Sequence, residues 1–229
     1  QYLMPRLYTK NFFKENRWFF YCFLLFMLIG GVGLYFMEIG DMLLFFSNNR
    51  TRFGDLFFSY FTKMGEAPAY VLALLVLIFF AYRYVIFLPL IGLVVTYVAF
   101  ITKAYFKHPR PFLYYRELDL FDQINVLENI ELHGGANSFP SGHTMSAFAL
   151  YAFVAFCLPY KKYAGVLLFL FALLVGLSRV YLVQHFFKDV YLGAIMGVLI
   201  AMILHRAQGY LSNHPDKWWN KAVRLKSKS

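Results

Sequence analysis

The chain has 229 residues, of which 60% are hydrophobic, 21% aromatic and only 15% charged. This composition excludes an ordinary soluble domain and predicts a membrane protein that forms one compact domain over residues 1–229. The net charge of +10 does not indicate nucleic-acid binding, because the basic residues cluster beside apolar runs, as membrane-flanking charges do.

The apolar pattern predicts an all-α fold, a polytopic membrane bundle of six transmembrane helices plus short interfacial helices. A span needs roughly 20 mostly apolar residues. The six expected spans are residues 18–37, 67–82, 84–102, 141–158, 163–177 and 190–204. Residues 38–64 contain apolar runs too short to cross, so we expect a re-entrant or interfacial helix there.

The connecting and terminal segments are polar or basic. Residues 1–17 mix basic and aromatic side chains and predict a cytoplasmic interfacial segment, and residues 205–229 predict a basic cytoplasmic tail. In that tail, Trp218 and Trp219 are suited to anchoring at the membrane surface. Arg83 marks an expected tight turn between the second and third spans. Residues 104–139 form a long polar loop, most simply a solvated face, although a loop of this length beside a site suits a lid.

Six spans place both termini on one side of the membrane, and the distribution of basic residues indicates which side. The termini side holds 13 of the 22 Lys and Arg residues, and the opposite side holds nine. Basic loops stay in the cytoplasm, so we expect cytoplasmic termini. The opposite ends of the spans would face the periplasm or exterior, and the short loops favour a bacterial inner membrane.

No cofactor or metal is expected from the sequence. Cys22 and Cys157 both lie inside apolar runs. Such cysteines are typical packing residues, so we predict neither a disulfide nor a metal site from them.

Residues 178–189 place Arg179, His185 and Asp189 at the mouth of an apolar segment. Ionisable groups beside hydrocarbon are costly and usually mark function. If this stretch is helical at its end, His185 and Asp189 share one face. Asp189 would then hold one imidazole nitrogen and leave the other free to attack an electrophile. Arg179 would offer a planar cationic fork to an oxyanion.

Two further segments reach the same outer face in this topology, the end of the third span and the start of the fourth. Ser141 and Gly142 would present free backbone N–H groups at a helix start, which favours an anion. Lys103, Arg110 and Arg179 would together bind phosphoryl oxygens. His143 would donate a proton to the leaving oxygen. These types of residue together suit a phosphate monoester or a diphosphate end.

The residues form a three-part pattern that resembles the signature of the type 2 phosphatidic acid phosphatase family. Its parts are Lys103 with Arg110-Pro111, Pro140-Ser141-Gly142-His143, and Ser178-Arg179 with His185 and Asp189. The resemblance implies metal-independent dephosphorylation through a phosphohistidine at His185, with His143 as the acid and then the base. It also implies lipid substrates such as phosphatidylglycerophosphate, undecaprenyl diphosphate, phosphatidate or lipid A phosphates.

Each part also has a simpler interpretation. The Pro-Ser-Gly-His stretch alone is a plausible turn before a helix, and Lys103 alone is an ordinary residue at the end of a span. Arg179 and Asp189 would neutralise each other as an ion pair. Glu66, at the outer end of the second span, would contact the substrate or position a cation of the site, or it is an interfacial carboxylate with no function.

Other functions remain open at this point. A lipid phosphotransferase would use the same site and differ only in the acceptor for the phosphoryl group. A phospholipid binder or translocator would need the cations but not two histidines and a carboxylate at these spacings. A vanadate-dependent haloperoxidase is disfavoured by six spans without a soluble domain. The expected partners are a lipid phosphate substrate and membrane lipids, not nucleic acid, and no oligomeric state is indicated.

Overall fold

The computed structural model describes residues 10–128 and 130–223, and within these ranges every regular element is helical. The all-α prediction is therefore confirmed. The elements are α1 (Lys10–Glu15), α2 (Arg17–Phe36), α3 (Asp41–Asn48), α4 (Arg52–Phe61), η1 (Thr62–Gly65), α5 (Ala67–Leu77), α6 (Tyr82–Phe106), α7 (Pro111–Glu117), η2 (Phe121–Gln123), α8 (Gly142–Cys157), α9 (Lys161–Tyr181), α10 (Phe187–Leu211) and η3 (Trp218–Asn220), where η marks a 3₁₀-helix.

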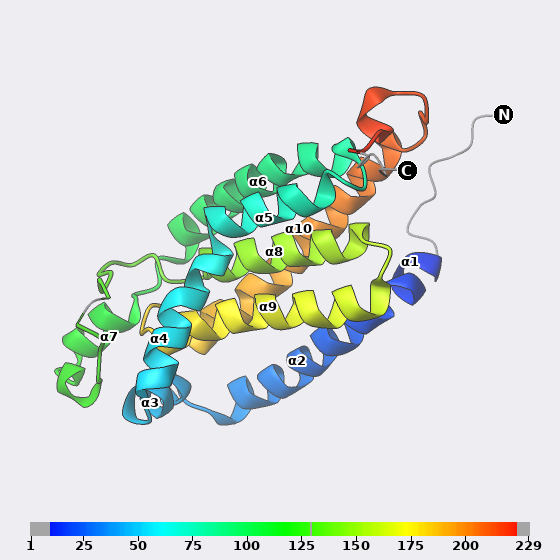
Figure 1. Ribbon diagram of the computed structural model, residues 1–229. Helices are drawn as coiled ribbons and strands as arrows, with labels where there is room; N and C mark the ends of the chain where they lie inside the picture. Colours follow the sequence, from blue (N-terminus) through cyan, green and yellow to red (C-terminus); the bar gives the residue numbers. More distant parts are fainter. Residues whose placement is uncertain (1–9, 129, 224–229) are drawn as a thin grey trace.

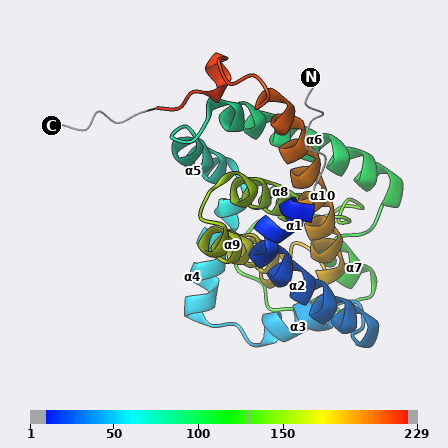
Figure 2. The ribbon, with the colours of Figure 1, turned by 90° about the vertical axis from the view of Figure 1, so that its right-hand side faces the viewer.

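The long helices form a bundle around α8, which packs against α10, α9 and α6 (Figures 1 and 2). At one end of the bundle lie α3, α4 and α7, and at the other lie α1 and η3 (Figure 1). The described parts of the two terminal regions therefore share one end, as the sequence predicts. Residues 38–64, expected to form a short re-entrant or interfacial helix, form α3, α4 and η1.

Four of the described helices, α2, α6, α9 and α10, are long and apolar enough to cross a membrane. The other two expected spans correspond to shorter apolar helices, α5 with 11 residues and α8 with 16. Six full-length spans are thus not confirmed. The span expected over residues 67–82 ends at Leu77, because the chain reverses over the next four residues. The backbone of that turn is held by the tail: Val223 N–H donates to the Ile78 carbonyl, and Tyr82 N–H to that of Lys221.

Some boundaries of the polar segments also differ from expectation. Arg83 lies in the first turn of α6, not in the turn, and its guanidinium donates to Gln208 Oε1 (3.0 Å) and Asn220 Oδ1. The first residues of the expected tail, 205–211, belong to α10. The expected loop 104–139 contains the end of α6, α7 and η2. Of the two terminal segments, residues 1–9 and 224–229 lie outside the described residues.

The central helix α8 is almost wholly buried, with 13 of its 16 residues inside the bundle. Glycines on α10 allow this close approach. A Cβ added at Gly197 would lie 2.5 Å from the Met145 carbonyl oxygen, and one at Gly193 would lie 2.7 Å from that of Ser141. Sixteen residues rise about 24 Å, less than the roughly 30 Å of a bilayer core.

The missing length of α8 falls at its N-terminus. At the other end only residues 158–160 separate the two helices, so the C-terminus of α8 is level with the N-terminus of α9. At the N-terminal end, a Cβ added at Gly176 of α9 would lie 3.3 Å from the Thr144 side chain. The first turn of α8 is therefore level with the last two turns of α9, and it is recessed within the bundle.

Candidate active site

The recessed start of α8 is fixed by Ser141. Its hydroxyl caps the helix by accepting from Thr144 N–H (3.4 Å) and Thr144 Oγ1 (2.9 Å), and its own N–H donates to the backbone carbonyl of Asp189 (3.0 Å). The predicted free N–H of Ser141 is therefore not observed, because this group ties α8 to α10. The N–H groups of Gly142 and His143, at the first two helical positions, have no hydrogen-bond acceptor among the described residues. Such orphan N–H groups at a helix start favour an anion.

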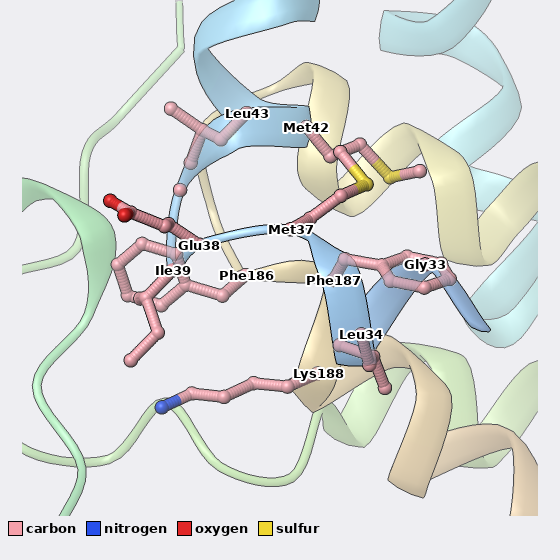
Figure 3. A pocket seen from close by; sticks show the side chains of 11 residues that line it. Gly33, Leu34, Met37, Glu38, Ile39, Met42, Leu43, Phe186, Phe187 and Lys188 are labelled. Carbon is pink, nitrogen blue, oxygen red and sulfur yellow. The ribbon is translucent and has the colours of Figure 1, made fainter. Parts of the chain in front are cut away.

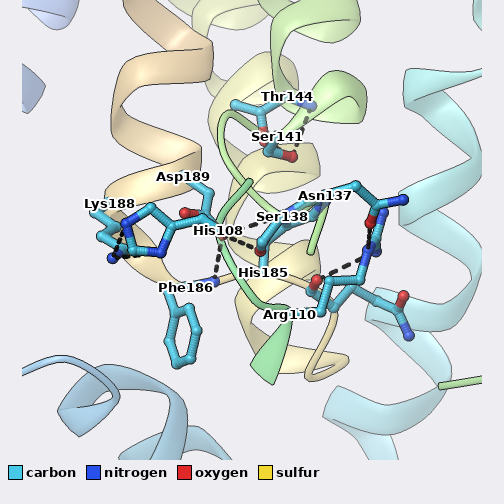
Figure 4. Close-up of polar contacts among 11 residues, drawn as sticks. His108, Arg110, Asn137, Ser138, Ser141, Thr144, His185, Phe186, Lys188 and Asp189 are labelled. Atoms are coloured by element: carbon cyan, nitrogen blue, oxygen red, sulfur yellow. Dashed lines mark hydrogen bonds and ion pairs between the residues drawn. The ribbon is translucent and has the colours of Figure 1, made fainter. Parts of the chain in front are cut away.

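His185 and Asp189 form the predicted pair, although His185 precedes α10 instead of lying on its helical face. His185 Nδ1 lies 3.3 Å from Asp189 Oδ2, and that oxygen also accepts from Phe186 N–H (3.0 Å) and from Ser138 Oγ (Figure 4). Ser138 Oγ also lies 3.2 Å from His185 Nδ1. With Nδ1 donating to the carboxylate, Nε2 carries the free lone pair, and it has no hydrogen-bond partner in the described part of the chain.

Burial keeps the His185 ring uncharged. The side chain is 1% exposed, and this burial lowers its pKa to about 3, with Asp189 opposing the shift and the charges of Arg179 and Arg110 adding to it. The imidazole is therefore neutral near pH 7, which is the form required of a nucleophile.

Three cations surround this pair, each from a different segment. Arg179 in the last turn of α9 donates to Thr62 Oγ1 (2.7 Å), while its Nε is buried without a partner. Arg110, before α7, donates from Nε to Asn137 Oδ1 (2.6 Å) and from a terminal nitrogen to the Gln184 carbonyl (3.4 Å) (Figure 4).

Lys103, in the last turn of α6, completes the set. It lies close enough to Arg110, Arg179 and Asp189 to interact electrostatically, and its ammonium has no hydrogen-bond partner among residues 10–128 and 130–223. A Cβ added at Gly142 would lie 4.0 Å from its Nζ. Cations held this close repel one another in a partly buried site, so an anion between them would be stabilised.

The interpretation in which Arg179 only neutralises Asp189 is wrong, because the structure contains no ion pair between them. Asp189 Oδ2 instead accepts hydrogen bonds from the residues around His185, while its Oδ1 is buried without a partner, and Arg179 donates to Thr62. The Arg179 guanidinium is therefore not neutralised by Asp189.

Glu66 contacts His143. Glu66 Oε1 lies 2.9 Å from His143 Nε2, and the two side chains are 47% and 36% exposed. By contrast, Arg110, Arg179, His185 and Asp189 are each less than 9% exposed. The side of the site formed by His143 and Glu66 is therefore its most open part.

Residues 131–138 cover the site and supply side chains that the sequence did not single out. Gln184 Nε2 donates to the Glu131 carbonyl (3.0 Å), and Ser138 N–H donates to that of His108 (3.0 Å). Asn137 and Ser138 lie just before the Pro-Ser-Gly-His motif, and this position in the sequence could have indicated that they belong to the site. No sequence pattern could have indicated a role for Thr62, because its contact with Arg179 joins residues 117 positions apart.

The described residues include no group of three or more His, Cys, Asp or Glu side chains arranged to hold a metal ion. The positions predicted to carry the chemistry are instead brought together as one polar cluster toward the end of the bundle where α3, α4 and α7 lie (Figure 1). They are Lys103, Arg110, Gly142, His143, Arg179, His185 and Asp189, with Glu66 joined through His143 and Ser141 in a structural position.

Comparisons with known proteins agree with this chemistry. Residues 71–212 match the PAP2 superfamily. The crystal structure of Aquifex aeolicus LpxE superposes with a TM-score of 0.61 and 31% identity, covering 74% of this chain and 95% of that one. Phosphatidylglycerophosphatase B of Bacillus subtilis is 37% identical over 32% of this chain and 40% of its own length. Undecaprenyl-diphosphatase BcrC of the same species is 30% identical over 55% of this chain and 56% of its own. The chain thus spans about half the length of these two relatives.

Proposed function

The chain belongs to the PAP2 superfamily, and we propose that it is an integral membrane lipid phosphatase. It hydrolyses a phosphate monoester or diphosphate of a lipid through a phosphohistidine at His185. The observation that carries this proposal is the state of the His185 ring, which is neutral and held through Nδ1 by Asp189, with Nε2 unbonded beside three cations.

In the first step, the phosphoryl oxygens bind to Lys103, Arg110 and Arg179 and to the N–H groups at the start of α8. His185 Nε2 attacks phosphorus while the bond from phosphorus to the lipid oxygen breaks. The leaving oxygen takes a proton from His143. Asp189 stabilises the positive charge that develops on the His185 ring, as the carboxylate of a catalytic triad does for its histidine.

In the second step, water attacks the phosphohistidine. His143, now neutral, accepts a proton from this water as the nitrogen–phosphorus bond breaks. Inorganic phosphate leaves, and both histidines return to their starting protonation states. The cations stabilise the phosphoryl oxygens in both steps, which is the main electrostatic contribution expected of such a site.

Glu66 is assigned a positioning role in this mechanism. Its contact with His143 Nε2 (2.9 Å) orients the ring and favours the protonated form that the first step requires, against burial and the charges of Arg179 and Lys103, which favour the neutral form. The earlier prediction of a substrate contact remains compatible with this role, because the carboxylate is also on the open side of the site.

The candidate substrates are phosphatidylglycerophosphate, undecaprenyl diphosphate, phosphatidate and lipid A phosphate, and the relatives named for the first two support this range. The bias of basic residues supports cytoplasmic termini in a bacterial inner membrane and an active site facing the periplasm or exterior. A phosphotransferase is the second candidate, since only the acceptor differs. A binder without chemistry is disfavoured by the Asp189–His185 arrangement, which binding does not need.

The test is phosphate release from these four lipids by detergent-purified protein, combined with trapping of the intermediate. Lipid labelled in its phosphate is mixed with the His143→Ala variant, quenched in base and digested. We expect label on the peptide that contains His185. Phosphate release by the wild type without any labelled histidine would contradict the mechanism, and lipid binding without release would support the binder.

A further inference from the structure

The most open side of the active site, formed by His143 and Glu66, faces η1 and the end of α4. The lipid part of a bound substrate must extend out of the site through an open side, because the buried sides are closed by α10 and by residues 131–138. The hydrocarbon chain would therefore leave the site beside Glu66, at the junction of η1 and α5.

An apolar groove lies in this neighbourhood, with a volume of about 590 Å³. It runs between one face of α4 with η1 and the side of α9. Its lining residues are Phe53, Leu56, Phe57, Tyr60, Phe61, Met64 and Phe171.

The groove extends from the level of the site into the hydrocarbon region. Phe171 precedes Arg179 by eight residues on α9, so it lies about 12 Å further along the bundle, toward the opposite membrane face. Its ring packs against that of Phe61 at the end of α4, with 5.5 Å between the ring centroids. A chain whose phosphate is bound at Arg179 would therefore pass these rings on its way into the bilayer.

The groove is joined to the site by a few residues of backbone. Thr62 follows Phe61 directly, and its hydroxyl accepts from Arg179 (2.7 Å). Two residues further on, the carbonyl of Met64 accepts from Tyr151 on α8 (2.8 Å). Glu66 then contacts His143. The segment that walls the groove thus also contacts a phosphate-binding cation and the proposed general acid.

We propose that this groove binds a hydrocarbon chain of the lipid substrate and selects substrates by chain length. The proposal rests on the proposed function for the identity of the ligand. The residues of α4 and η1 lie before residue 71, outside the part of the chain that matches the superfamily, whereas Phe171 lies within it.

A second cavity, of about 280 Å³, is the rival location (Figure 3). Apolar side chains from α2, α3 and the start of α10 line it, and the charged ends of Glu38 and Lys188 lie at its edge (Figure 3). Neither lining includes a proposed catalytic or phosphate-binding residue, although Phe186 and Lys188 of the second cavity adjoin His185 and Asp189 in the chain. The groove beside α4 is favoured because Thr62 and Glu66, which belong to the segment that walls it, contact Arg179 and His143 on the open side of the site.

The test compares kcat/KM for phosphate release from the same lipid phosphate with chains of 16 and eight carbons. In Leu56→Asn, a polar group enters the groove at a position 55% exposed, where folding tolerates it. We expect kcat/KM to fall about tenfold for the long chain, because one apolar contact is lost. We expect a change of less than about twofold for the short chain, which does not reach along the groove.

The matched control is Leu28→Asn, the same substitution on the surface of α2 at a position 67% exposed. An equal loss in both variants would overturn the proposal, since it would mean that any lipid-facing leucine has this effect. Equal losses for long and short chains in Leu56→Asn would also overturn it. A chain-length effect in Leu34→Asn, in the second cavity, but not in Leu56→Asn would move the site to that cavity.

A second measurement separates this proposal from the proposed function. A lipid phosphate with a photoreactive group near the end of its chain is bound to His185→Ala, irradiated, and the labelled peptide identified. Label on residues 53–64 or on Phe171 supports the groove even if the wild type releases no phosphate, in which case only the proposed function fails. Label confined to residues 33–43 or 186–188 overturns the groove.

Discussion

Two regions of the molecule contribute to the site in different ways. The region from residue 71 to 212, which matches the superfamily, supplies His185 and Asp189, which are buried and share several hydrogen bonds. The region before it supplies Thr62 and Glu66, each through one contact. We propose that the first region carries the chemistry, whereas the second controls access and orientation. Substitutions of His185 or Asp189 should then abolish turnover, and those of Thr62 or Glu66 should tune it.

The largest effect is expected for His185→Ala, which removes the nucleophile. We predict that kcat falls by about 10⁴-fold or more. His205→Ala is the control, because His205 is also a histidine in an apolar setting, packed among Phe12, Phe153 and Phe156 far from the site. It should lower thermal stability but retain kcat. Similar kcat values for the two variants would contradict the assignment of His185 as the nucleophile.

Asp189→Asn should have the next largest effect. The amide cannot stabilise a charged imidazole as the carboxylate does, and it also disturbs the tautomer of His185, so we predict a fall in kcat of about 10³-fold. Ser138→Ala removes a hydroxyl bonded to both members of the pair and should cost about tenfold. A reversed order of these two effects would assign the orientation of His185 to Ser138 instead.

Glu66→Gln tests the region that tunes activity. We predict a fall in kcat of about tenfold to 100-fold, because the neutral amide no longer stabilises protonated His143. The acid must carry its proton, so activity is lost as pH rises, and the alkaline limb of the pH profile should move to lower pH. Glu66→Asp, which keeps the carboxylate, should move the alkaline limb of the pH profile back toward its wild-type position. A purely structural role would lower kcat without moving the profile.

The smallest effect concerns stability. The pKa of His185 is about 3 in the folded protein, against 6.5 for the unperturbed side chain. Between these values the unfolded chain binds more protons, so stability is fully present above pH 6.5 and is lost as the pH falls toward 3, by about 1.4 kcal/mol per unit. Thermal unfolding in detergent at pH 6.5 and 5 should show a loss of about 2 kcal/mol that His185→Gln lacks. An identical loss in the variant would show that other groups are responsible.

Much of the fold follows from the sequence because hydropathy is a local property. All six expected spans correspond to helices, and the groups that carry charge beside them meet at one end of the bundle. The end of α5 at Leu77 was missed, because residues 221 and 223 of the tail hold the turn that follows it. Such long-range backbone bonds have no local pattern.

The candidate site was predictable where a residue type and its spacing determine a role. His185 and Asp189 meet because four residues and one helix start fix their separation. The role of Ser141 was not predictable, because its N–H group is taken up by the carbonyl of Asp189, a partner on another helix. Glu66 was noticed as a carboxylate near the outer surface, but its contact with His143 depends on how α5 packs against α8.

The short length of α8 has a consequence for which phosphates the protein encounters. The helix rises about 6 Å less than the hydrocarbon thickness and its first turn is recessed beside α9, so a phosphoryl group bound there would have to pass below the level of the neighbouring helix ends. A phosphate ester dissolved in water has no anchor to offset that transfer. A lipid carries its headgroup to this depth as it moves within the bilayer. One helix length therefore sorts phosphate compounds by their partitioning into the membrane, before any contact recognises them.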